Sequence, residues 1–164
     1  MSSTEESSIG PPSSISVDEW IFSDINGENS IKNQKESFGF LSEFRKNDDI
    51  LVIRMLSPWT EKLYGLMKQM TPQVRAASKI LQSIIRDSKK CRIYYNGEIK
   101  KLPSDLEKEA PRKDLYLVEL LYTAKPDEFV TTDSVLLEFI TTKINLNACQ
   151  RDVFLIAYSC PNRR

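Results

Sequence analysis

The sequence predicts an α+β domain, with a largely antiparallel sheet of four to five strands and a pair of helices packed on it, preceded by a disordered N-terminal arm. Three observations lead to this prediction. Two hydroxyl-proline pairs, Ser57-Pro58 and Thr71-Pro72, each precede an apolar run at helical spacing. The pair Asn96-Gly97 is typical of a tight β-hairpin turn. Several β-rich or alternating apolar runs lie between residues 115 and 160.

Residues 1–48 are expected to form a flexible acidic arm, and residues 49–164 a single α+β domain. The opening MSSTEESSIGPPSSIS is rich in Ser, Glu and Pro and offers few side chains to bury. Residues 1–49 carry ten acidic and four basic side chains, whereas residues 50–164 carry thirteen acidic and nineteen basic ones. The island Trp20, Ile21 and Phe22 packs either on the protein's own core or in a partner's groove, and is a candidate docking segment.

The segment from Ile50 to Leu56 predicts a strand that leads into two successive helices. The first begins at Pro58 and ends near Met70, with an apolar stripe of Trp59, Leu63, Leu66 and Met70. The second, residues 72–88, has an apolar stripe of Val74, Ala77, Leu81 and Ile84 and cations on the nearly opposite side. A basic helix face is either an ordinary solvated surface or a binding surface. The candidate face for an anionic partner consists of Arg75, Lys79, Arg86, Lys89, Lys90, Lys100 and Lys101.

The second half of the chain is expected to supply the remaining strands. Cys91–Leu102 is expected to form a hairpin around Asn96-Gly97. Residues 115–122 alternate like a central strand, and residues 151–160 are interpreted as a final strand stopped by Pro161. Residues 135–146 are compatible with an amphipathic helix, but their β-branched residues favour a strand.

The sequence lacks most of the residues and motifs on which common enzyme active sites are built. The chain has no histidine, three cysteines without a CxxC pair, and five glycines without a phosphate-binding loop. The carboxylate pairs Asp48-Asp49 and Asp127-Glu128 lie in predicted loops, where solvated charge is the simpler interpretation. We therefore expect a protein without enzymatic activity, cofactor or metal.

Several segments carry a resemblance at the level of element order. They are Pro11-Pro12 in the arm, LVIRMLSP from Leu51 to Pro58, the helix through Ile80 to Ile85, and the pattern from Val135 to Cys160. This order resembles that of the matrix proteins of rhabdoviruses, particularly the compact plant-infecting members. The chain departs from the animal-virus members because Ser13-Ser14 follows the two prolines instead of a PPxY motif, and because its arm is acidic instead of basic.

The resemblance implies a structural protein of the virion that self-associates, condenses the nucleocapsid and bridges it to the inner face of the membrane. Its partners would be other copies of itself, the viral nucleoprotein-RNA complex, an anionic membrane surface and RNA itself. Its place would be the virion and the host cytoplasm, peripheral to membranes, neither secreted nor transmembrane. The alternative is an intracellular adaptor or RNA-binding regulatory protein that does not polymerise.

Overall fold

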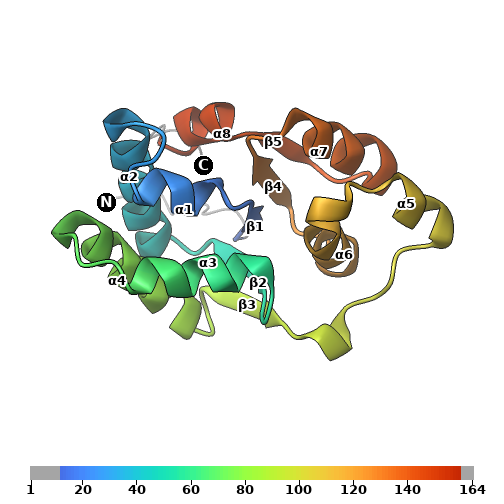
Figure 1. Cartoon of the computed structure of the whole chain (residues 1–164), viewed down its shortest axis with the longest axis horizontal. Coiled ribbons are helices and arrows are strands. Elements are labelled where there is room, and N and C mark those ends of the chain that lie inside the picture. Colours follow the sequence, from blue (N-terminus) through green and yellow to red (C-terminus); the bar gives the residue numbers. More distant parts are fainter. Residues whose placement is uncertain (1–11, 160–164) are drawn as a thin grey trace, which may run out of the picture.

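A computed structural model describes residues 12–159, which contain a five-stranded parallel sheet (Figure 1). The strand order is β3-β2-β1-β4-β5, and each of the four neighbouring pairs is parallel. The bounds are β1 (Ser14–Val17), β2 (Ile50–Arg54), β3 (Cys91–Tyr94), β4 (Glu128–Thr131) and β5 (Ala148–Gln150). The prediction of a largely antiparallel sheet is therefore wrong.

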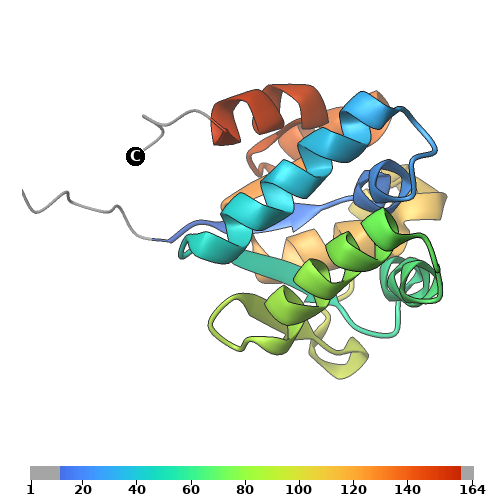
Figure 2. The ribbon, with the colours of Figure 1, turned by 90° about the vertical axis from the view of Figure 1, so that its left-hand side faces the viewer.

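Helices cover both faces of the sheet, and the described residues contain eight α-helices, not a pair. One face is covered by α1 (Trp20–Ile25), α2 (Ile31–Lys46), α3 (Pro58–Met67), α4 (Pro72–Arg86) and α8 (Arg151–Tyr158). The opposite face is covered by α5 (Ser104–Glu109), α6 (Leu115–Ala124) and α7 (Ser134–Phe139). In Figure 2, α2 and α4 cross in front of the sheet, and α6 lies behind it. Such crossover helices are required to connect parallel strands.

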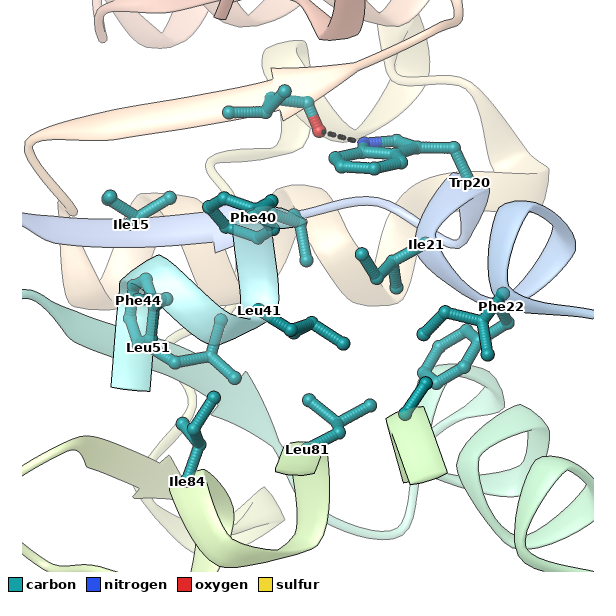
Figure 3. Packing of buried hydrophobic residues seen from close by; sticks show 14 of the residues in the cluster. Ile15, Trp20, Ile21, Phe22, Phe40, Leu41, Phe44, Leu51, Leu81 and Ile84 are labelled. Carbon is teal, nitrogen blue, oxygen red and sulfur yellow. Dashed lines mark hydrogen bonds between the residues drawn. The ribbon is translucent and has the colours of Figure 1, made fainter. Parts of the chain in front are cut away.

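Residues 14–46 belong to the core instead of forming an arm. β1 is the central strand, because it pairs with both β2 and β4. Trp20, Ile21 and Phe22 are buried in the larger hydrophobic cluster, where Trp20 Nε1 donates to Val130 O at 3.0 Å (Figure 3). The expected docking segment is therefore covered by the protein's own core, and the expected division at residue 48 does not match the structure. Residues 1–11, the remainder of the expected arm with Pro11 of the resemblance, lie outside the described residues.

Three expected strands are helices. Residues 115–122 lie in α6, residues 135–146 begin with α7 and continue as a π-helical turn (Ile140–Ile144), and residues 151–158 form α8. The Asp133 side chain caps α7 by accepting from the backbone N–H groups of Val135 and Leu136. The expected hairpin is also wrong, since β3 pairs with β2 and Asn96-Gly97 lies in a single 3₁₀ turn, η1 (Asn96–Glu98).

The segment between Ile50 and Arg86 agrees with the prediction of a strand followed by two helices. Pro58 and Pro72 are the first residues of α3 and α4. Val74, Ala77, Leu81 and Ile84 are buried, as the apolar stripe predicts. In α3 the stripe is buried only as far as Leu66, because Met70 lies beyond the helix and is 76% exposed.

Candidate functional site

The carboxyl ends of β1 and β4 form the topological switch point of the sheet. From β1 the chain continues to β2 on one side, and from β4 it continues to β5 on the other. In open parallel sheets of this kind, ligands bind outside the carboxyl ends of the strands at the switch point. Figure 2 shows that β1 runs toward this edge, where α1 and α3 lie.

One threonine links the Asp18 carboxylate to the backbone of Asp133 across the switch point. Asp18 follows β1, and its Oδ2 accepts from Thr131 Oγ1 of β4 at 2.8 Å. The same hydroxyl oxygen accepts from the backbone N–H of Asp133 at 3.0 Å. Asp18 Oδ1 accepts from the Glu19 backbone N–H at 2.5 Å. Thr131 is fully buried, so it fixes the relative positions of Asp18 and Asp133.

Asp114 brings a third carboxylate to this edge from the opposite face of the sheet. It is half-buried at the start of α6, and among the described residues its carboxylate has no hydrogen-bond or ion-pair partner. Burial, and after it the negative charges of Asp18 and Asp133, together raise the pKa of Asp114 to about 6. The three carboxylates are therefore within electrostatic reach of one another. We call Asp18, Asp114 and Asp133 the acidic edge.

The environment of Asp18 also disfavours its charged form. Burial is the main cause of the raised pKa of Asp18, opposed by the hydrogen bonds from Thr131 and the Glu19 N–H. The negative charges of Glu19 and Asp133 raise the pKa of Asp18 further. Carboxyl groups with perturbed pKa values cluster at functional sites.

A lysine stands beside the acidic edge. Lys62 Nζ of α3 lies 3.0 Å from Glu19 Oε2, and the Tyr116 hydroxyl donates to Glu19 Oε1 at 2.9 Å. Tyr116 is on α6, so Glu19 joins helices that cover opposite faces of the sheet. Burial and the charge of Glu19 raise the pKa of Tyr116, which keeps the hydroxyl protonated as a donor.

The acidic edge suits a hard divalent cation that is only partly surrounded by protein. Within residues 12–159, no three Asp, Glu or Cys side chains lie close enough together to hold a metal ion by themselves. Mg²⁺ does not require such a cage, because it commonly binds through one or two carboxylates and fills its octahedron with water and substrate phosphate oxygens.

The structure separates the residues of the predicted basic face. Arg75, Lys79 and Arg86 lie exposed along α4, and Lys89 is exposed just after it. Lys90 is buried and donates to the carbonyl oxygens of Phe44 and Asn47, with its Nζ 4.6 Å from the centre of the Phe44 ring. Lys90 therefore does not belong to an exposed anion-binding face.

Lys100 and Lys101 are exposed but lie on the other side of the sheet. The Lys100 backbone N–H donates to Thr123 Oγ1 of α6 at 2.9 Å, whereas α4 packs on the opposite face of the sheet. We call Arg75, Lys79 and Arg86 the α4 basic face. The two-sided character predicted for this helix is confirmed.

Sequence reasoning missed the acidic edge and considered other carboxylates instead. Asp49 accepts from the Ser13 backbone N–H and from the Tyr158 hydroxyl, and Asp127 accepts from the Ser14 backbone N–H and hydroxyl. These two hold the start of β1 in place. The sequence does contain a pattern that could have indicated the acidic edge. Asp18 in ISVD and Asp133 in FVTTD each follow a short apolar run.

Comparisons with protein-family models, curated proteins and solved structures found no match to this chain. They neither support nor contradict the resemblance to matrix proteins, although the predicted element order on which it rested is not the observed one. None of the helices in residues 12–159 combines the length and the apolar character needed to cross a lipid bilayer.

Proposed function

We propose that this protein is a phosphodiesterase that uses a divalent cation to hydrolyse the backbone of nucleic acid at the acidic edge. The observation that carries the proposal is the convergence of Asp18, Asp114 and Asp133 at the switch point of the sheet. This proposal replaces the expectation of a protein without enzymatic activity, because the sequence alone does not place these three carboxylates together.

Asp18 and Asp133 are the residues proposed to hold the cation. Thr131 holds the Asp18 carboxylate and the Asp133 backbone, the N–H groups of Val135 and Leu136 hold the Asp133 carboxylate, and each carboxylate retains lone pairs beyond these hydrogen bonds. The repulsion between neighbouring carboxylates is relieved when a cation binds between them. A bound divalent cation would supply charge neutralisation at the phosphate and increase the acidity of water.

Asp114 is the proposed general base. Its carboxylate is half-buried without a partner, and a pKa raised to about 6 is close to the neutral pH at which it would work. In the proposed step, Asp114 accepts a proton from water as the water oxygen bonds to phosphorus. The bond from phosphorus to the leaving oxygen breaks, and that oxygen then takes up a proton from solvent.

The α4 basic face supports a polymeric substrate. Arg75 and Lys79 are exposed and have no ion-pair partner among the described carboxylates, and Arg86 contacts only Gln82, at 3.4 Å. Helix α4 follows α3, which carries Lys62 beside the acidic edge. Cations arranged along a helix attract a phosphate backbone more than they attract one small phosphate ester.

The test is cleavage of fluorescently labelled single-stranded RNA and DNA with Mg²⁺, with Mn²⁺ and with EDTA. We expect cleavage that requires the cation and falls at least a hundredfold in Asp114→Asn, a variant that removes no hydrogen bond within the described protein. Asp105→Asn is the matched control, because Asp105 is exposed on α5. Cleavage that survives EDTA, or that Asp114→Asn performs as fast as the unaltered protein, would overturn the proposal.

A second candidate is a structural protein of the matrix type that self-associates and meets anionic membranes or the nucleocapsid through α4. The observation that favours it is the same row of exposed, unpaired cations. Light scattering across a salt series, with and without anionic vesicles, separates the candidates. Salt-sensitive assembly or vesicle binding without cleavage supports the structural protein, and cleavage by a monomer supports the phosphodiesterase.

A further inference from the structure

A cavity of about 270 Å³ lies between α1 and the end of α3. Ser23, Asn26 and Glu28 line it from one side, where the Asn26 amide donates to Glu28 Oε1 at 2.9 Å, and Lys62, Gly65 and Gln69 line it from the other. Its volume is slightly below the roughly 300–1,000 Å³ of typical small-molecule sites. The cavity can therefore accept a group about as large as the base and sugar of one nucleotide.

Lys62 connects this cavity with the acidic edge. Its side chain lines the cavity, and its Nζ is 3.0 Å from Glu19 Oε2, next to Asp18 in the sequence. The ammonium group has three donors, of which Glu19 uses one, and the Lys62 side chain is 51% exposed. Its remaining donors are available to an anionic group between the cavity and the acidic edge.

We propose that the cavity binds the base and sugar of one nucleotide, and that Lys62 binds the phosphate joining this nucleotide to the acidic edge. This inference rests on the proposed function. The amide groups of Asn26 and Gln69 and the hydroxyl of Ser23 supply both donors and acceptors, as the edge of a base requires. Glu19 is a positioning residue, since it holds the Lys62 ammonium without contacting the nucleotide, and Tyr116 in turn holds the Glu19 carboxylate.

Gly65 makes the inference testable, because a side chain there would fill the cavity. A Cβ built on Gly65 meets no other atom within 4 Å, and Gly65 lies inside α3, where any side chain is compatible with the backbone. Gly65→Leu is therefore expected to occupy the cavity without strain in the fold. Gly39→Leu is the matched control, since Gly39 is also helical with open space around its Cβ but lies in α2.

The experiment measures equilibrium binding of fluorescent single-stranded hexanucleotides and of mononucleotides in EDTA, where cleavage does not occur. We expect Gly65→Leu and Lys62→Met each to weaken binding at least fivefold, with Gly39→Leu unchanged. Gln69→Glu, which places a negative charge in the cavity, is a second variant in case Gly65→Leu does not fold, and it is expected to act in the same direction. Binding by folded Gly65→Leu or by Gln69→Glu that equals the unaltered protein would overturn the inference.

A kinetic measurement distinguishes this inference from the proposed function. We expect Gly65→Leu to raise the KM for an oligonucleotide at least tenfold, and Gly39→Leu to leave that KM unchanged. If the protein binds nucleotides, Gly65→Leu blocks this binding, and no nucleic acid is cleaved, then the proposed nucleotide-binding cavity is supported and the proposed phosphodiesterase activity is contradicted. If Gly65→Leu cleaves oligonucleotides with an unchanged KM, then the proposed phosphodiesterase activity is supported and the proposed nucleotide-binding role of the cavity is contradicted.

Discussion

Arg151 Nε donates to Asp24 Oδ2 at 2.5 Å, joining α8 to α1 across 127 residues of sequence. Both side chains are almost completely buried, at 3% and 0% exposure. Asp24 also accepts from Ser37 of α2 and from Asn29, so this one carboxylate connects three segments that cover the same face of the sheet. The pair therefore contributes to the rigid support behind α1, the helix that follows Asp18 and Glu19.

Removing the guanidinium should destabilise the fold strongly. Arg151→Met leaves the Asp24 charge buried without its cation, a change that typically costs about 3–5 kcal/mol. Urea unfolding followed by circular dichroism measures this loss. Asp152→Asn is the control, since Asp152 contacts the same guanidinium but is 79% exposed, and a loss in Arg151→Met no larger than in this control would contradict the account.

Asp114 should make stability depend on pH. In the unfolded chain an aspartate titrates near 3.9, whereas burial and neighbouring carboxylates raise the pKa of Asp114 to about 6. The folded state therefore holds this proton to higher pH, and the stability it provides is present below about pH 4 and lost as the pH rises through about 6. Relative to Asp114→Asn, the unaltered protein should lose about 1 kcal/mol between pH 4 and 7.5, allowing for solvent screening.

The measurement for Asp114 is the free energy of unfolding of both proteins in EDTA at several pH values. Parallel pH dependence of the two would contradict the raised pKa of Asp114.

Adding Mg²⁺ at pH 7.5 should stabilise the unaltered protein, since a ligand that binds only the folded state raises its stability.

The Thr131 hydroxyl should matter for both stability and cation binding. Thr131→Val keeps the shape but removes the donor to Asp18 and the acceptor for the Asp133 N–H, which should cost about 1–3 kcal/mol. Without this link the Asp18 carboxylate and the backbone that carries Asp133 lose their fixed arrangement, so cation affinity should fall about tenfold. Calorimetric titration with Mn²⁺ measures the affinity. Thr142→Val, at an exposed position of the π-helical turn, should leave it unchanged, and equal affinity in both variants would refute this role of Thr131.

Charge reversal on α4 should weaken binding of polyanions without unfolding the domain. Arg75, Lys79 and Arg86 are exposed, and changing all three to Glu replaces attraction for phosphate by repulsion. We expect at least a tenfold loss of affinity for single-stranded nucleic acid at low salt and a smaller dependence of affinity on salt. Lys100→Glu with Lys101→Glu, on the other face of the sheet, is the control. If that control weakens binding as much as the α4 variant, the binding surface is not on α4.

The sequence predicts secondary structure correctly where the spacing of apolar residues fits only one kind of element. In α3 and α4, proline at the first turn and apolar residues at helical spacing leave no alternative. In α6, Leu117 and Leu121 are helical neighbours, but the same apolar run also alternates like a strand, so its pattern fits both structures. β1 was missed because SISV is short and lies among serines and prolines.

The candidate site depends on a long-range pairing that local patterns do not contain. Asp18 and Asp133 each follow a strand, but only the pairing of β1 with β4 places them at one edge. Whether strands pair parallel or antiparallel is decided by the segments that connect them, and two connecting helices, α6 and α7, have sequence patterns that also fit strands. A largely antiparallel sheet, as the sequence predicted, has no topological switch point, so the prediction gave no reason to expect a site at this edge.

The most direct test of the acidic edge is a titration of the ¹⁵N-labelled protein with Mn²⁺, followed by loss of amide NMR signals near the bound ion. We predict that the amide signals of Asp18, Glu19 and Asp133 disappear first, and that Asp133→Asn, which retains the helix cap, requires at least ten times more Mn²⁺. Signals that disappear first at exposed carboxylates elsewhere, or at the same Mn²⁺ concentration in Asp133→Asn, would contradict cation binding at the switch point.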